Sequence, residues 1–359
     1  MSLGINTKRR SEATARAKSS RALKPIDRPI FINGLGRSGT TIIHALLSTH
    51  PNVNWMSLLC GKFPSRPYLN RWLMRALDIP LINIYLKWRF IPLENYSFWD
   101  IHYRGFFNPC RDLFASDVDP CTTRSLRKAF SQLLTSKRNR LLIKITGVPR
   151  ISYLHALFPD AKFVHVTRDG RAVATSRMRT PFWTGWDGLN LWAGEMPDHY
   201  RQEWKRHGYS FAALAGIEWK THLDQMAEFR KNYPHINVLE VKYEEFCADP
   251  LLQIKEIARF CELPWNANFE SRIRSHYVES ENNKWRSDLT EEQQAILQDV
   301  LAIQLVEQGY ELDEETTRTA SARGAEAGLQ TGGPALTDSS VVKRQDVRNP
   351  ISSSASGTR

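Results

Sequence analysis

Apolar residues along the chain fall into short continuous runs and into longer stretches with helical spacing. The short runs are typical of strands in a parallel sheet that is buried on both faces. They predict strands at Pro29–Asn33, Leu141–Ile145, Lys162–Thr167 and Asn237–Lys242. Apolar residues three or four positions apart predict helices at Thr40–Ser48, Ile151–Phe158, Arg171–Arg179, Phe211–Lys231, Leu251–Cys261 and Glu291–Glu307.

Strands that alternate with helices predict an α/β fold, in which helices flank both faces of a central parallel sheet. Ligands of such sheets bind beyond the carboxyl ends of the strands. The folded domain is expected at residues 28–313. Residues 314–359 are rich in Thr, Ser, Gly, Ala and Arg and hold no aromatic residue. Because such a segment buries little apolar surface, we expect a disordered tail there.

Positive charge is concentrated near the start of the chain. The formal net charge is +11, and residues 1–24 hold seven Lys and Arg against one Glu. Residues 1–27 are therefore expected to be a disordered basic leader, and no apolar run follows it to indicate a secretory signal. The folded part keeps a modest excess of charge and no recognised nucleic-acid fold, so nucleic acid is not an expected partner.

The cysteines and the most apolar long segment indicate the cellular location to be expected of the protein. Five Cys residues occur in no CxxC pair and no metal-ligand spacing. They predict free thiols, a reducing cytoplasmic location and no metal site. The segment from Leu73 to Leu93 is interrupted by four charged residues. Since a spanning helix needs about 20 apolar residues, no integral membrane segment is expected.

A Gly-rich turn, Gly34-Leu35-Gly36-Arg37-Ser38-Gly39-Thr40-Thr41, lies between the first predicted strand and helix. Such a turn and the helix N-terminus together favour binding of an anion. A dinucleotide site would need an acidic residue about 20 positions later, and residues 53–60 offer none. A Walker loop would need Lys where Thr40 stands, which argues against a P-loop kinase that uses ATP and Mg²⁺.

The third interpretation rests on Arg37 inside the turn, followed by Ser-Gly-Thr-Thr. This loop resembles the 5′-phosphosulfate loop of the PAPS-dependent sulfotransferases, bacterial branches of which use Arg-Ser-Gly-Thr-Thr. The resemblance implies a P-loop-like three-layer sandwich and 3′-phosphoadenosine 5′-phosphosulfate (PAPS) as the donor, with no metal required. It also implies that the cofactor is bound by Gly36, Arg37, Ser38, Gly39, Thr40 and Thr41.

Three later segments carry the same resemblance. In the stretch from Phe163 to Ser176, Arg168 leaves a strand end and Ser176 follows eight residues later, as in the family's 3′-phosphate motif. Val241–Pro250 is similar to a Tyr-Glu element of the family, and Asn283–Arg286 to its Lys-Trp-Arg segment. The resemblance implies that the nucleotide also contacts Arg168, Ser176 and Lys284, with Tyr243 and Ser280 as weaker candidates.

The implied reaction transfers a sulfuryl group to a hydroxyl or amine of an unidentified small-molecule or glycan acceptor. Arg37 and Lys144 match the family's catalytic cations, but Thr146 stands where cytosolic members carry a His base. Glu94, Asp100 and His102 are the candidate bases. We favour His102 and Asp100, because a neutral His is suited to take a hydroxyl proton near neutral pH.

Two points are left open by the sequence. The aromatic segment 181–192 is expected to form the acceptor pocket, since aromatic faces suit sugars, phenols and apolar tails alike. A non-catalytic nucleotide-binding protein and a P-loop kinase remain as alternatives, and the oligomeric state is not predicted.

Overall fold

A computed structural model describes residues 24–86, 90–107, 111–181, 183, 185, 190–191 and 194–312. Its centre is a parallel sheet of five strands in the order β2-β3-β1-β4-β7. The strands are β1 (Ile30–Gly34), β2 (Val53–Trp55), β3 (Arg140–Thr146), β4 (Lys162–Thr167) and β7 (Val238–Lys242). A separate antiparallel pair consists of β5 (Asn190–Leu191) and β6 (Gly194–Glu195). The chain leaves β1 towards β2 on one side and later reaches β4 on the other, so the switch point of the sheet lies at the end of β1.

The described helices divide into the long ones that cover the sheet and a set of short ones between them. The α-helices are α2 (Thr40–Ser48), α3 (Leu58–Lys62), α4 (Tyr68–Leu77), α5 (Pro80–Leu86), α6 (Tyr96–Asp100), α7 (Pro120–Leu133), α8 (Ile151–Leu157), α9 (Gly170–Met178), α10 (Asp198–Arg206), α11 (Phe211–Asn232), α12 (Tyr243–Ala248), α13 (Pro250–Phe260), α14 (Ala267–Arg274), α15 (Trp285–Asp288) and α16 (Glu291–Glu307). Two 3₁₀ turns are η1 (Ala115–Asp117) and η2 (Asn282–Lys284).

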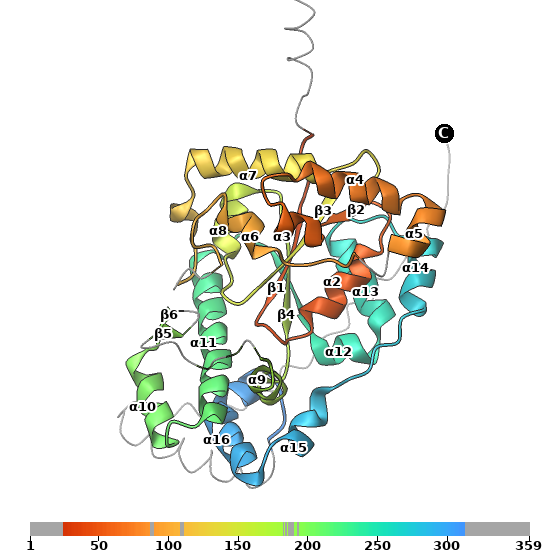
Figure 1. The fold of residues 1–359 in the computed structure, drawn as a ribbon. Helices are drawn as coiled ribbons and strands as arrows, with labels where there is room; N and C mark the ends of the chain where they lie inside the picture. The colour runs from red at the N-terminus through yellow and green to blue at the C-terminus, as the bar shows by residue number, and fades with distance from the viewer. Residues whose placement is uncertain are drawn as a thin grey trace, which may run out of the picture.

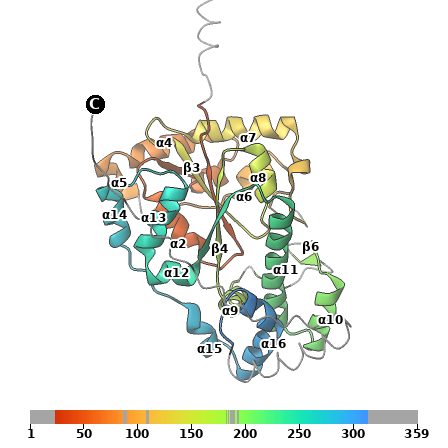
Figure 2. The same ribbon diagram turned by 180° about the vertical axis from the view of Figure 1, so that it is seen from behind.

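Alternation along β1 divides the core into two layers. Ile30 and Ile32 pack with α2, α4 and α13, whereas Phe31 packs on the opposite face with α7, α8 and α11. Figures 1 and 2 show α2, α12 and α13 on one side of the sheet and α8 and α11 on the other. A third apolar cluster joins α9, α10, α11 and α16 beyond the carboxyl ends of the strands.

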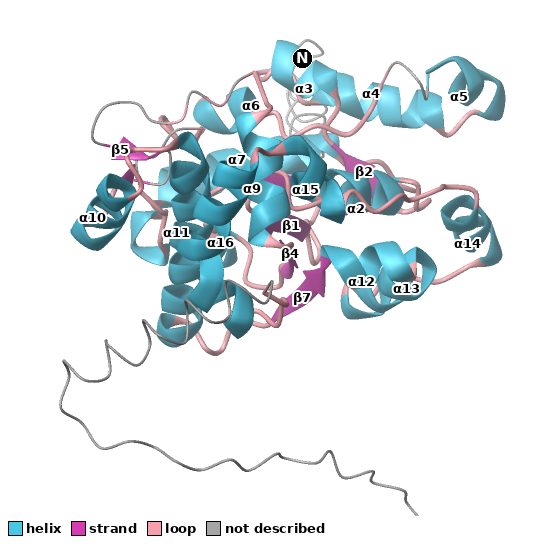
Figure 3. Cartoon of the chain, turned by 90° about the horizontal axis from the view of Figure 1, so that it is seen from below, coloured by secondary structure: helices cyan, strands magenta, loops and turns pink. Residues whose placement is uncertain are grey.

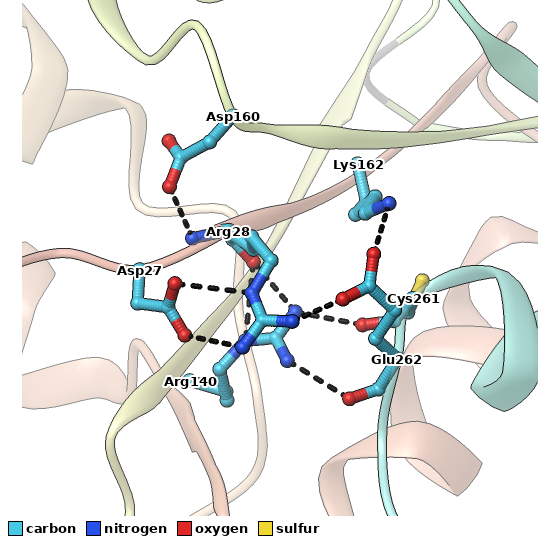
Figure 4. Close-up of polar contacts among 7 residues, drawn as sticks. All are labelled: Asp27, Arg28, Arg140, Asp160, Lys162, Cys261 and Glu262. Carbon is cyan, nitrogen blue, oxygen red and sulfur yellow. Dashed lines mark hydrogen bonds and ion pairs between the residues drawn. The ribbon is translucent and has the colours of Figure 1, made fainter.

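A cluster of charged side chains fixes the opposite, amino-terminal edge of the sheet (Figure 4). The buried guanidinium of Arg140, at the start of β3, donates to the carbonyl oxygens of Arg28 (2.8 Å) and Cys261 (2.7 Å). Arg28 in turn pairs with Glu262 and Asp27, and its backbone N–H donates to Asp160. These contacts tie the entry of β1 to β3 and to the turn after α13.

The predicted α/β fold is confirmed, and so are its main elements. The helices Thr40–Ser48 and Glu291–Glu307 and the strand Lys162–Thr167 have the predicted bounds, and the other predicted elements differ by one or two residues. The sequence did not predict the short helices α3–α6. The outward sides of α3, α4 and α5 carry large apolar residues that blur the helical pattern, and α6 has only five residues.

Several expectations fall partly or wholly outside the described residues. The tail at 314–359 and residues 1–23 of the basic leader lie there, as does Cys110. The four cysteines that are described, Cys60, Cys121, Cys247 and Cys261, are free thiols. Within the described part of the chain, no helix has the length and apolar character needed to cross a bilayer.

Candidate active site

The predicted anion loop lies at the end of β1, next to the N-terminus of α2. Gly34, Arg37 and Gly39 all have positive φ angles, of 151°, 79° and 91°. A Cβ on Gly34 would lie 2.5 Å from the carbonyl oxygen of Val166 in β4, so no other residue fits there without a shift. The loop therefore lies tightly against the sheet, between the ends of β1 and β4.

The N-terminus of α2 has the properties of an anion site. Gly39 is its N-cap, so no side chain caps the helix, and the first turn holds no acidic residue. The first N–H groups of a helix lack partners within the helix and carry a partial positive charge. Ser38 and Thr40 are buried beneath the loop, whereas Thr41 faces outward.

Arg37 is held in a backbone conformation that non-glycine residues rarely adopt. Its guanidinium Nε donates to Oγ of Ser176 on α9, at 2.8 Å. Strained conformations of this kind concentrate at functional sites, where the surroundings enforce them. The strain at Arg37 directs its cation across the loop towards the second predicted phosphate motif.

Arg168 joins that second motif to the loop. It follows β4 and is buried, and its guanidinium donates to the carbonyl oxygen of Arg37 (3.1 Å) and to Oδ1 of Asn282 (3.1 Å). The guanidinium carbon of Arg168 lies 4.3 Å from the ring centroid of Tyr243, a cation–π contact. The structure thus brings Arg37, Arg168, Ser176 and Tyr243 together in one site.

Tyr243 also makes Gly39 necessary. A Cβ at position 39 would lie 2.2 Å from Cδ2 of Tyr243. The ring therefore packs directly on the backbone of the loop and beneath Arg168, and connects the start of α12 to the start of α2.

Some arginines of this region have a carboxylate partner and others do not. Arg171 pairs with Asp169 (2.7 Å) and Arg177 with Glu218 (2.6 Å), both pairs being buried. Among the described residues, neither Arg37 nor Arg168 has a carboxylate within ion-pair distance. Two guanidinium groups at the mouth of the loop are therefore available to an external anion, and Arg forks bind phosphate in a bidentate manner.

Lys144 connects the loop to a carboxylate. Its Nζ lies 2.8 Å from Oγ1 of Thr41 on α2 and 2.9 Å from Oε1 of Glu94. The hydroxyl of Thr146, two residues later on β3, donates to both oxygens of Glu94 at 3.1–3.2 Å. The lysine does not extend to solvent, because only 8% of its surface is exposed.

Tyr96 holds Thr146, the residue whose hydroxyl bonds to this carboxylate. Its hydroxyl donates to the carbonyl oxygen of Thr146 and accepts from the same residue's N–H, both at 3.0 Å. Burial, with the charge of Glu94 as a smaller cause, raises the pKa of Tyr96, so this phenol stays protonated. His44, beneath Lys144, stays neutral, because burial first and the lysine charge second lower its pKa to about 3.

The two favoured bases have other partners. His102 bonds through Nδ1 to Oγ of Ser125 (2.7 Å) and packs on Phe98. Burial lowers the pKa of His102. Asp100 accepts from the backbone N–H of Phe107 at 3.0 Å. Among the described contacts, neither residue reaches Lys144 or the loop, whereas Glu94 does.

The segment that contains η2 reaches the site through Asn282 and not through Lys284. Lys284 is exposed and pairs with Glu281, and none of its described contacts is with Arg168 or the loop. Asn282, two residues earlier, makes that contact instead. Sequence reasoning missed Asn282, since a lone Asn in a loop gives no signal. The hydroxyl of Tyr243 lies 3.5 Å from the carbonyl oxygen of Glu279 in the same segment.

The predicted acceptor segment is described only in part. Trp183 donates from Nε1 to Glu218 (3.0 Å), and its ring lies 5.9 Å from that of Phe211. This side chain packs on α11. Residues 182, 184, 186–189 and 192–193 lie outside the described part of the chain.

The parallel sheet with a Gly-rich loop at the end of β1 places the chain among the P-loop-like α/β proteins. Residues 29–267 match the model of the sulfotransferase family, so the chain belongs to that family. The family membership expected from the motifs is confirmed. Sulfotransferase STF9 from Mycobacterium avium shares the fold, with a TM-score of 0.51 and 20% identity over 85% of this chain and 83% of that one.

Two relatives illustrate the spread of the family. The omega-hydroxy-beta-dihydromenaquinone-9 sulfotransferase Stf3 of Mycobacterium tuberculosis is 24% identical over 338 residues, 84% of this chain and 80% of that protein. Protein-tyrosine sulfotransferase A of Caenorhabditis elegans is 25% identical over 243 residues, 66% of this chain. The chain spans 50% of the length of that protein and 38% of a similar Drosophila melanogaster protein.

Proposed function

We propose that this protein binds PAPS at the loop after β1 and transfers its sulfuryl group to a hydroxyl or amine of an acceptor. The observation that carries the proposal is the continuous chain of contacts from Thr41 through Lys144 to Glu94. It joins an anion loop, a buried cation and a carboxylate, which are the three groups that such a transfer requires.

The donor site is supported by the chemistry of its residues. The uncapped N-terminus of α2, with the N–H groups of residues 39–41, suits the 5′-phosphosulfate. Arg168 and Ser176 suit the 3′-phosphate, because a guanidinium and a hydroxyl are both donors and the arginine has no carboxylate partner among the described residues. Tyr243 and Lys284 are proposed to contact the nucleotide on the same side.

The cations would act on the leaving group. PAPS supplies a sulfuryl group that is bonded to a phosphate oxygen, and negative charge develops on that oxygen as the bond breaks. Lys144 and Arg37 would stabilise this charge, and the buried position of Lys144 strengthens the effect. As in phosphoryl transfer, placement and electrostatics would supply most of the rate enhancement.

Glu94 is the base that we propose. Its carboxylate would take the proton of the acceptor hydroxyl as the oxygen bonds to sulfur, so the proton moves to Oε1 or Oε2. Contacts with Lys144 and Thr146 keep this carboxylate beside the loop, and Tyr96 in turn holds Thr146. His102 and Asp100 have no comparable contact, and variants at Glu94 and His102 distinguish the two assignments.

The acceptor is proposed to be a small molecule or glycan with a hydroxyl. The names of two relatives specify acceptors, a protein tyrosine and a hydroxylated dihydromenaquinone, and both carry hydroxyl groups. The lysine–carboxylate pair beside the loop suits either an alcohol or a phenol.

Chromatographic detection of 3′,5′-adenosine bisphosphate (PAP) tests the activity. The protein is incubated with PAPS, EDTA and a panel of phenols and alcohols. We expect PAP to form together with a sulfated acceptor in the wild type and not in Lys144→Ala. A parallel incubation contains ATP and Mg²⁺ in place of PAPS and EDTA. Consumption of ATP there, together with intact PAPS in the first incubation, would instead identify a kinase. Tight binding of PAP without turnover on any acceptor would indicate a non-catalytic nucleotide-binding protein.

A further inference from the structure

Helices α3, α4 and α5 present an unusual number of large apolar side chains to solvent. Trp72 is 60% exposed, Leu81 75% and Tyr85 79%. We call the following exposed side chains the α3–α5 ridge: Leu58, Phe63, Tyr68, Trp72, Ile79, Leu81, Ile82 and Tyr85. Figure 3 shows the three helices in a row on the side of the molecule away from β7. Contiguous exposed apolar surface of this kind marks an interaction site.

The ridge is a regular face of the helices. Tyr68, Trp72 and Arg75 follow each other at helical spacing along the exposed side of α4, and Ile79 continues that spacing just after the helix. Leu73, Met74 and Leu77 are buried on the other side. On α5, Leu81, Ile82 and Tyr85 are exposed together. Helix α4 therefore has one face that packs in the core and a second, largely apolar face that nothing in the described chain covers. On α5, Leu86 packs against the core and the three exposed side chains are likewise uncovered.

Positive charge is interspersed with these apolar groups. Residues 57–93 hold six Lys and Arg against one acid, Asp78. That acid is engaged by Lys137 (3.3 Å) and Arg138 (3.0 Å). Lys62, Arg66 and Arg75 are exposed and make no ion pair with any described residue. Burial, followed by the charges of Arg75 and Arg71, lowers the pKa of Lys24, which shows how closely the cations crowd.

A cationic surface with exposed aromatic and aliphatic groups matches one kind of partner. Trp and Tyr favour the boundary between lipid headgroups and acyl chains, aliphatic side chains enter the acyl region, and Lys and Arg bind anionic headgroups. Arg75 lies 5.2 Å from the ring centroid of Trp72, so a cation and an aromatic ring reach the surface together.

The ridge is connected to the candidate base. α3 packs beside α6, and the hydroxyl of Ser97 on α6 donates to the carbonyl oxygen of Gly61 on α3. The backbone N–H of Leu93, next to Glu94, donates to the carbonyl oxygen of Met56 at 2.9 Å. The chain thus runs from the exposed helix α5 into the residue that we propose as the base.

We propose that the α3–α5 ridge docks the protein on the surface of an anionic lipid bilayer, with its apolar side chains inserted among the lipids. This inference rests on the proposed function. The docked arrangement brings Glu94 close to the bilayer, where an acceptor whose apolar tail is embedded in the lipid would present its polar end. The acceptor class is then an amphiphile with a hydroxyl at the lipid–water boundary.

Charge also disfavours a second copy of the chain as the occupant of the ridge. In a two-fold symmetric contact the same patch meets itself. Lys62, Arg66 and Arg75 of each copy would then lie near the same cations of the other, and like charges placed together in an interface are unfavourable.

Sedimentation with vesicles tests the proposal. The full-length protein is mixed with phosphatidylcholine vesicles with and without phosphatidylglycerol, at low and high salt. We expect binding only to the anionic vesicles, and weaker binding at high salt. Leu81→Glu/Tyr85→Glu should abolish it. The double variant Arg66→Glu/Arg75→Glu should bind the anionic vesicles more weakly at low salt, by roughly fivefold for each cation that is lost.

Matched variants on other surfaces are the controls. Ile303→Glu/Val306→Glu on α16 alters two exposed apolar residues, and Lys205→Glu/Arg206→Glu on α10 alters two exposed cations. Both should bind vesicles like the wild type. The basic leader is present in every variant, so a loss confined to the ridge variants is due to the ridge.

Three results would overturn the proposal: no vesicle binding, equal binding by the ridge variants, or a wild-type dimer that the ridge variants convert to a monomer. PAP binding, measured by the thermal shift of each variant, is the independent readout. If the protein binds PAP but does not bind vesicles, the docking proposal fails and the proposed function stands. If vesicles bind and PAP does not, the proposed function fails alone.

Discussion

Lys144 and Glu94 form an ion pair of 2.9 Å that joins strand β3 to the segment between α5 and α6. The two residues are 50 positions apart in the chain. The same lysine also contacts Thr41 at the start of α2, so the pair lies directly beside the anion loop.

We predict that Glu94→Gln abolishes transfer but keeps nucleotide binding. The amide has nearly the same shape and cannot take a proton, and loss of a general base lowers the rate roughly 10²–10⁴-fold. PAP formation with a hydroxyl acceptor gives the rate, and calorimetry gives the affinity for PAP. His102→Gln, the matched variant at the base favoured from sequence, should keep full turnover. The opposite pattern would return the role to His102.

Gly39→Ala should unfold or open the loop. Its methyl group would overlap the ring of Tyr243, and the residue has a φ of 91°. Gly105→Ala is the control. Its φ of 87° imposes the same backbone strain, but nothing lies within 4 Å of a Cβ there, so no steric overlap is added. A left-handed Ala costs about 1–2 kcal/mol. Denaturant unfolding should show a free energy of unfolding lowered by this amount in both variants, and Gly39→Ala should also lose PAP binding. Equal effects of the two variants would show that the contact with Tyr243 does not matter.

Acid should destabilise the protein through a buried pair of histidines. His165 on β4 stacks on His222 on α11 with ring centroids 5.3 Å apart. Burial, and for His165 the charge of its partner, lowers the pKa of both, that of His222 to about 4. The unfolded state therefore binds more protons as the pH falls below the ordinary value near 6.5. Stability is fully present above that value and is lost below it.

The loss attributable to His222 alone is about 3 kcal/mol between pH 6.5 and pH 4. Denaturant unfolding at a series of pH values measures it. His165→Phe/His222→Phe should flatten this dependence, whereas the exposed His199→Gln should leave it unchanged. If the stability of the double variant fell with pH as steeply as that of the wild type, the histidine pair would not be the cause.

The sequence predicted the parts of the site that are encoded locally. The run Gly34–Thr41 combines a strand end, glycines that permit positive φ and a helix start, so the loop and α2 follow from neighbouring residues. Arg168 and Ser176 are likewise eight positions apart across a single strand–helix turn. Parallel pairing of β1 with β4 then brings the two motifs together.

The remaining part of the site depends on long-range packing that the sequence pattern does not show. Glu94 reaches Lys144 only because the short helices α3–α6 fold back between β2 and β3. Asn282 reaches Arg168 from a segment 114 residues away. No local period or motif indicates either contact, so the sequence leaves Glu94 as one of three candidate bases and gives no signal for Asn282.

Calorimetric titration with PAP, AMP and ATP–Mg²⁺ is the most direct test of the central claim, that the site binds a 3′-phosphorylated donor. The wild type should bind PAP far more tightly than AMP or ATP–Mg²⁺. Arg168→Ala should narrow the preference for PAP over AMP by at least roughly thirtyfold, because truncating a buried charged partner costs about 2–5 kcal/mol. Equal affinities for PAP and AMP, or tightest binding of ATP–Mg²⁺, would contradict the account.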